Sequence, residues 1–101
     1  MRITADQQAI VLATVAENFG SDAQVRLFGS RVDDSKRGGD IDLLITTRER
    51  DVSAIMRAEI ALITKLQMKL GEQKIDVLLD YPTRKERPPI FQIAQQTGIL
   101  L

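Results

Sequence analysis

The sequence predicts an α/β (α+β) fold in which three strands form a small mixed sheet with flanking helices. Three observations lead to this class. The apolar patterns follow the order helix, strand, strand, helix, strand, helix along the chain of 101 residues. The link between the first two strands is too short for a crossover, so these strands should be antiparallel. A long helix joins the second and third strands, which suits a right-handed parallel crossover.

The first helix is predicted to begin at a capping box. Thr4 and Gln7 stand three residues apart, the spacing at which each side chain can accept a hydrogen bond from the other residue's free backbone N–H. Gly20 is predicted to end this helix. Its inward side should consist of the apolar residues at helical spacing, which are Val11, Leu12, Val15, Ala16 and Phe19.

Three short apolar runs are predicted to be the strands. They cover residues 24–28, 41–46 and 75–79. The second run is almost entirely apolar after its acidic start, as expected for a central strand. Residues 31–39 are polar and end in two glycines, so we expect a loop or a short helix there.

Two further helices follow the second and third strands. Asp51 can cap the long helix, which should run to about Leu70 and stop at Gly71. We expect its buried side to be Ile55, Met56, Ile60, Ile63, Leu66 and Leu70. Two prolines open a short last helix and Gly98 ends it. The inward residues of that helix should be Ile90, Ile93 and Ala94.

Length and composition exclude several classes of protein. A chain of 101 residues suffices for one domain, which we assign to residues 1–101. Its formal net charge is zero, which argues against general nucleic-acid binding. The absence of cysteine excludes disulfides and cysteine-based metal sites. The absence of histidine excludes a Ser-His-Asp triad and any imidazole base.

The expected location is the cytoplasm. No apolar run reaches the length needed to span a membrane. The opening residues, from Met1 to Asp6, do not lead into the apolar core of a signal peptide. We therefore expect no membrane partner.

The most informative motif is a Gly-Ser pair followed by two alternating carboxylates. Nine residues separate Ser30 from Asp40, and Asp42 follows at the next alternate position. Residues two apart on a strand share a face, so the carboxylates would repel each other unless a cation lay between them. Magnesium suits such oxygen ligands. Gly29 allows close backbone approach, and a helix beginning at Ser30 could direct free N–H groups at a phosphate.

A simpler interpretation of each residue stays open. Asp40 follows two glycines, where aspartate is often only a turn residue. The Gly-Ser pair could likewise be an ordinary turn. Asp42 is harder to explain in that way, because a carboxylate inside an apolar strand is costly without a partner.

The segment LFGSRVDDSKRGGDIDLLI resembles the signature of the polymerase-beta-type nucleotidyltransferases. In particular it resembles their small prokaryotic branch, the minimal nucleotidyltransferases, which are often encoded beside a HEPN-domain protein. The resemblance extends to the strand KIDVLL, where Asp76 matches the third carboxylate of the family, and to the closing helix.

The resemblance implies an activity and a set of site residues. The fold would be that of the polymerase-beta-like nucleotidyltransferases. The catalytic carboxylates, which would also bind Mg²⁺ in a two-metal site, would be Asp40, Asp42 and Asp76. The residues holding the phosphates of a nucleoside triphosphate, ATP by resemblance, would be Gly29, Ser30 and Arg31. AMP would pass to a hydroxyl acceptor and pyrophosphate would leave.

The resemblance also implies partners, and the alternatives differ in class. The acceptor hydroxyl would lie on a HEPN-type toxin, with this chain as the antitoxin of a toxin–antitoxin pair. Alternatively, the chain is an antitoxin-like binding module that acts by occlusion with little catalysis. A third interpretation is transfer to a small molecule such as an aminoglycoside, but relatives with such acceptors carry a further domain.

Two segments have no assigned role. The apolar end, Ile99 to Leu101, is either a surface for self-association or a partner, or a tail that packs back on the domain. The basic run that includes Arg84, Lys85 and Arg87 is either a solvated loop or a nucleotide clamp.

Overall fold

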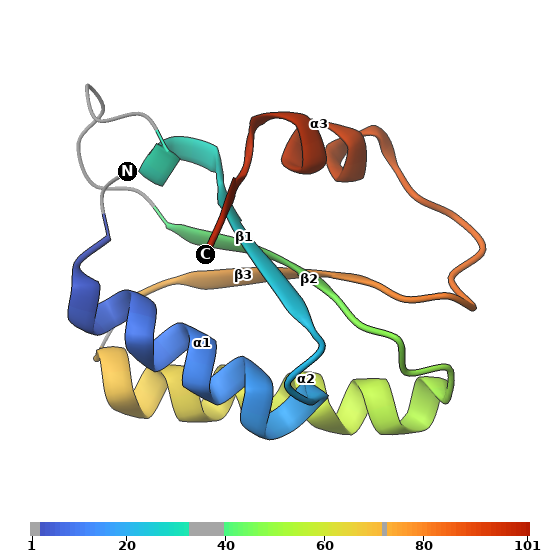
Figure 1. Ribbon diagram of the computed structural model, residues 1–101, viewed down its shortest axis with the longest axis horizontal. Coiled ribbons are helices and arrows are strands. Elements are labelled where there is room, and N and C mark those ends of the chain that lie inside the picture. The colour runs from blue at the N-terminus through green and yellow to red at the C-terminus, as the bar shows by residue number, and fades with distance from the viewer. Residues whose placement is uncertain (1–2, 33–39, 72) are drawn as a thin grey trace.

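The computed structural model describes residues 3–32, 40–71 and 73–101. Its three α-helices flank a mixed sheet (Figure 1). In chain order, the described elements are α1 (Ala5–Phe19), β1 (Gln24–Phe28), the 3₁₀ turn η1 (Gly29–Val32), β2 (Ile41–Thr46), α2 (Val52–Leu70), β3 (Ile75–Asp80), α3 (Pro89–Thr97) and β4 (Ile99–Leu100). None of the described helices is long and apolar enough to cross a membrane.

The sheet has the strand order β3-β2-β1-β4. As predicted, β1 is antiparallel to β2 and β2 is parallel to β3. The prediction of three strands was one too few, because β4 pairs antiparallel with β1 at Arg26 and Leu27. The Leu101 backbone N–H continues this pairing by donating to the Val25 carbonyl at 3.0 Å. The apolar end therefore packs back on the domain.

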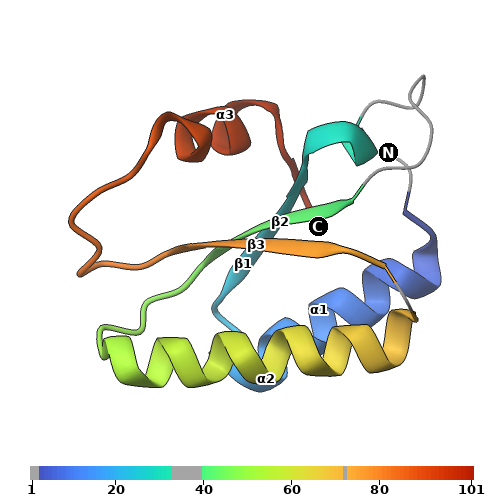
Figure 2. The ribbon, with the colours of Figure 1, turned by 180° about the vertical axis from the view of Figure 1, so that it is seen from behind.

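Helices cover the two faces of the sheet unequally. Helices α1 and α2 lie together on one face, and α3 lies on the other (Figures 1 and 2). The main core lies beneath α1 and α2 and includes Leu27, Leu43 and Leu66. The second core, beneath α3, is smaller and consists of Phe28, Leu44, Phe91 and Ala94, with Leu78 packed against it.

The predicted start of α1 is confirmed. The Gln7 backbone N–H donates to the Thr4 hydroxyl at 3.0 Å, and the Thr4 backbone N–H donates to the Gln7 side chain at 3.0 Å. The predicted inward stripe was too wide, because Leu12 and Ala16 are exposed. The residues of α1 that are buried are Val11, Thr14 and Val15, a narrower stripe than predicted.

The inward sides of the other two helices also needed correction. Met56 and Ile60 of α2 are exposed, and Leu62 is fully buried in their place. Residues 55, 62 and 66 form the narrow stripe that reaches the core. On α3, Phe91 and Ala94 are buried, whereas Ile90 and Ile93 are exposed. Apolar character alone did not identify which side of these helices packs on the sheet.

Candidate functional site

Strand pairing places three side chains in one row across the face of the sheet that α3 partly covers. Phe28 of β1 stands opposite Asp42 of β2, and Asp42 stands beside Asp76 of β3. Because directly paired residues on neighbouring strands share a face of the sheet, all three point to the same face. Two carboxylates distant in the sequence thus become direct neighbours at the strand ends nearest η1.

The Asp42 carboxyl is the group most affected by this arrangement. Partial burial is the main cause that raises its pKa, and the negative charges of Asp76 and Asp40 raise it further. A side-chain hydrogen bond with Asp76 acts in the same direction. Lys74 opposes these effects only partly. A cation bound between the carboxylates would relieve this crowding.

Asp40 stands slightly apart from the other two carboxylates. The pairing of Ile41 with Ile75 brings the preceding residues, Asp40 and Lys74, close together. The Lys74 Nζ lies 3.6 Å from an Asp40 carboxylate oxygen, and both side chains are well exposed. Within residues 3–32, 40–71 and 73–101, no three potential ligands are grouped tightly enough to form a metal site. The structure therefore shows a close pair, Asp42 and Asp76, with Asp40 held by a lysine beside it.

The turn after β1 touches the carboxylate pair. Gly29 has a φ of 76°, a value that favours glycine. A Cβ built on Gly29 would overlap the Asp42 carboxylate. Glycine is therefore required twice here, once for the backbone angle and once for the close approach. It brings the start of η1, with Ser30, directly against Asp42.

A pocket of about 740 Å³ contains both the turn and the carboxylate pair. Its polar part consists of Gly29, Ser30, Asp42 and Asp76. The rest of its lining is mostly apolar and is formed by Phe28, Val32, Leu78, Ile90, Ile93 and Thr97. Four of the six predicted site residues thus line one pocket, whereas Asp40 and Arg31 are not part of its lining.

Arg31 is held elsewhere. Its Nη2 donates to the Gln73 side-chain oxygen at 3.1 Å, and Gln73 Nε2 donates to the Leu70 carbonyl at 3.0 Å. The guanidinium is thereby connected to the end of α2. In this arrangement Arg31 joins η1 to the segment before β3.

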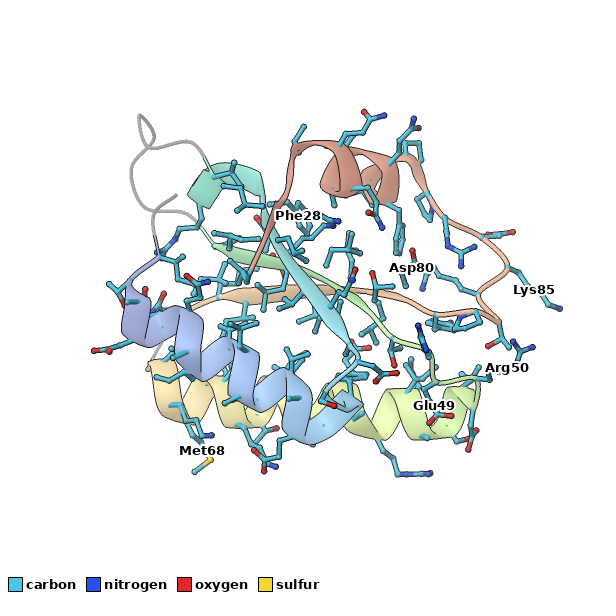
Figure 3. The ribbon with its side chains drawn as sticks, viewed as in Figure 1. Phe28, Glu49, Arg50, Met68, Asp80 and Lys85 are labelled. Atoms are coloured by element: carbon cyan, nitrogen blue, oxygen red, sulfur yellow. The ribbon has the colours of Figure 1, made fainter. Side chains whose placement is uncertain are left out.

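The basic run after β3 lies at the opposite end of the sheet. The Arg84 guanidinium stacks 4.5 Å from the centre of the Phe91 ring, and Arg87 Nε donates to Asp80 at 2.8 Å. Lys85 projects away from the domain (Figure 3). None of the three contributes to the described lining of the 740 Å³ pocket. Arg84 and Arg87 hold their own loop against α3 and β3.

Sequence reasoning missed several residues around the site. The apolar side of the pocket was not anticipated, although Leu78 follows Asp76 by two residues and so had to share its face. Lys74 was missed because its position beside Asp40 depends on the register of β3 against β2, which the sequence alone did not fix. Nothing in the sequence connected Gln73 with Arg31.

Comparison with known proteins supports the resemblance at its coarser level. The family model described as "Nucleotidyltransferase domain" matches residues 9–99. That range includes the Gly-Ser turn, all three predicted carboxylates and α3. A search of curated proteins gave no match. The match covers most of the chain and the whole of the pocket, and the chain therefore belongs to the nucleotidyltransferase domain family.

Proposed function

We propose that the protein is a Mg²⁺-dependent nucleotidyltransferase that transfers AMP from ATP to a hydroxyl acceptor. One observation supports this most strongly. Asp42 of β2, Asp76 of β3 and the Gly29 turn that follows β1 meet in one pocket. A fold in need of stability alone has no use for a partly buried carboxylate, Asp42, with a second carboxylate, Asp76, beside it.

The chemistry of each residue suits a different role in the reaction. Gly29 and Ser30 bind the outer phosphates, because the backbone of η1 can approach a ligand closely there. Asp76 takes the proton of the acceptor hydroxyl. The acceptor oxygen then forms a bond to the α-phosphorus of ATP, the bond from that phosphorus to the β-phosphate oxygen breaks, and pyrophosphate leaves with the electron pair.

The donor set fits magnesium. Hard carboxylate oxygens are the ligands that Mg²⁺ takes in proteins, with phosphates and water completing its shell. Asp42 and Asp76 would hold the ion. Asp40 would become a third ligand if its ion pair with Lys74 were broken. Bound there, Mg²⁺ would neutralise charge on the transferred phosphoryl group.

The acceptor that we propose is a hydroxyl on a HEPN-type protein in the cytoplasm, with this chain as the antitoxin of the pair. The resemblance of the Gly-Ser and carboxylate motifs to the minimal nucleotidyltransferases supports this choice. The pocket lies on the sheet face that α3 covers only in part (Figure 1), and is thus open to a macromolecular acceptor.

One observation favours a second candidate, an antitoxin-like module that binds and occludes its partner with little catalysis. Lys74 already supplies a positive charge to Asp40. If that pair persists when nucleotide is bound, the site lacks its third carboxylate, and turnover would be slow. The two candidates predict different amounts of covalent product with the same partner.

Labelled ATP distinguishes them. The protein is incubated with Mg²⁺ and ATP labelled at the α- or the γ-phosphate, with and without the protein encoded beside it. The proposal predicts that only the α-label becomes covalently attached to the partner. The Asp42→Asn variant should abolish this, and the Asp80→Asn variant, changed at the other end of the sheet, should retain it. Partner inhibition without label transfer would support occlusion instead.

A further inference from the structure

We infer that the apolar wall of the pocket binds the flat face of the nucleotide base and does not read its edge. The wall is defined here as Phe28, Val32, Leu78, Ile90 and Ile93. The enzyme should therefore accept ATP and GTP alike and prefer both to pyrimidine nucleotides. This inference rests on the proposed function, because it takes the phosphates to lie at Gly29.

One side of α3 lines the pocket with apolar residues. Phe91 and Ala94 anchor this helix and are 4% and 0% exposed. Ile90 and Ile93 are 40% and 51% exposed, yet both line the pocket. Residues three or four apart share a helix face, so Thr97 lies on the same side. The helix thus presents to the pocket an apolar surface that its own packing does not use.

The apolar wall adjoins the carboxylates and the phosphate turn directly. Leu78 follows Asp76 on the same face of β3, and Phe28 stands beside Asp42 in the same row. Val32 is in the same 3₁₀ turn as Ser30. The apolar wall therefore begins where the phosphate and carboxylate groups end. A nucleotide with its phosphates at the turn would extend its base over this wall.

The described wall offers few side-chain groups that could form hydrogen bonds with a base. Among the described lining residues outside the carboxylate end, which belong to residues 3–32, 40–71 and 73–101, Thr97 carries the sole side-chain hydrogen-bonding group. Its hydroxyl donates to the Ile93 carbonyl at 2.7 Å, so its proton is already used. Adenine and guanine differ in the donors and acceptors on their edges, and a site distinguishes them by pairing those groups. A wall without such side chains recognises ring area.

The base is a better occupant than an acceptor side chain. The pocket volume of about 740 Å³ lies within the range of small-molecule sites, roughly 300–1,000 Å³. The wall is also concave and directly joined to the phosphate turn, so one ligand can contact both. An acceptor would instead approach the α-phosphate from the open side of the pocket.

Calorimetry with a ligand that has no base tests the inference. Affinities are measured in Mg²⁺ for ATP, GTP, CTP, UTP and inorganic tripolyphosphate. We expect ATP and GTP to agree within about twofold and to bind about tenfold more tightly than tripolyphosphate, which corresponds to about 1.4 kcal/mol. The Ile93→Ser variant should weaken ATP and GTP about fivefold and leave tripolyphosphate unchanged. The Ile60→Ser variant is the matched control, since Ile60 is 69% exposed on α2.

The outcomes separate this inference from the proposed function. Tripolyphosphate binding that Asp42→Asn abolishes, with ATP binding no more tightly, would overturn the base site and leave the transferase intact. A large preference for ATP over GTP would overturn recognition by the ring face. No binding of any triphosphate would overturn both. If Ile93→Ser does not fold, as judged by circular dichroism, Ile90→Ser takes its place with the same expected result.

Discussion

Strand β3 carries two carboxylates on the same face, and their surroundings differ. Asp80, at one end, accepts a hydrogen bond from Arg87 at 2.8 Å, and its side chain is only 18% exposed. Asp76, at the other end, faces the Asp42 carboxyl in an open pocket. The first carboxylate has a cationic partner within the fold, and the second has a like charge as its neighbour.

The difference indicates which carboxylate serves stability and which serves binding. At the Asp80 end, Arg84 donates to the Leu79 carbonyl and Arg87 to the Tyr81 carbonyl, and both hold the loop between β3 and α3. At the Asp76 end, a glycine brings a turn against Asp42, and the pKa of Asp42 is raised by burial and by its acidic neighbours. Like charges held together in this way are costly until a cation binds.

The largest expected effect is that of Gly29→Ala. A non-glycine residue at this φ of 76° costs about 1–3 kcal/mol, and the new Cβ would also displace the Asp42 carboxylate. We expect a loss of stability in urea denaturation and a loss of Mg-ATP binding. Gly71→Ala is the matched control, since Gly71 has a similar φ of 84° with no neighbouring atom within 4 Å. It should show the backbone cost alone. Equal Mg-ATP affinity in both variants would contradict the account.

The next effect is a change in the free energy of unfolding that has opposite signs in two Asp→Asn variants. It is measured in EDTA, without metal. Asp80→Asn removes a carboxylate paired with Arg87 and should lower the free energy of unfolding by about 1 kcal/mol. Asp42→Asn relieves crowding and should raise it, by no more than about 1 kcal/mol because water screens the site. Changes of the same sign in both variants would remove the distinction between the two ends of β3.

A smaller effect is the pH dependence of the stability that Asp42→Asn gains over the wild type. The pKa of Asp42 is raised above 3.8 in the folded protein, so folding favours the protonated carboxyl. Its stabilising contribution is complete below about pH 3.8 and is lost as the pH rises through the raised pKa. The advantage of Asp42→Asn over the wild type should therefore grow with pH. Burial also raises the pKa of Glu59, but Glu59 is present in both proteins. An advantage that is greatest at low pH would be the opposite result.

The smallest effect concerns Lys74. In Lys74→Gln the exposed pair with Asp40 is lost, which should change stability by less than about 0.5 kcal/mol. The Lys74 ammonium competes with Mg²⁺ for the Asp40 carboxylate. Without it, the affinity for Mg²⁺ in the absence of nucleotide should rise about two- to fivefold. Lys65→Gln is the control, because Lys65 pairs with Glu17 at 2.6 Å and joins α2 to α1. A similar gain in both variants would mean that net charge, and not Asp40, is responsible.

Periodicity and turn residues were sufficient to predict most of the fold. The capping box at Thr4 and the connection lengths depend on local rules, and the structure confirms both. The fourth strand was missed because Ile99 and Leu100 are too few to form a pattern. On α3 the burial of Ala94 was predicted correctly, but that of Ile90 and Ile93 was predicted wrongly, because apolar residues occur on both the core side and the pocket side of this helix. Apolar character cannot distinguish burial in a core from the lining of a site.

The sequence indicated the carboxylate pair more clearly than its surroundings. The motif predicted Asp42, the family resemblance added Asp76, and the parallel pairing of β2 with β3 places the two side by side. The link from Arg31 to Gln73 spans 42 positions and depends on where α2 ends in space. The pairing of Asp40 with Lys74 depends on a register that the sequence alone did not fix. Their roles in catalysis stay predictions.

The two ends of β3 should differ in metal binding, and paramagnetic resonance with Mn²⁺ tests this difference directly. Manganese suits the same oxygen ligands as magnesium, and its free and bound forms are distinguishable by their spectra. With ATP present, the wild type and Asp80→Asn should bind Mn²⁺ equally, and Asp76→Asn should bind it at least about tenfold more weakly, since it loses a charged ligand. Equal binding by Asp76→Asn and the wild type would contradict the central claim.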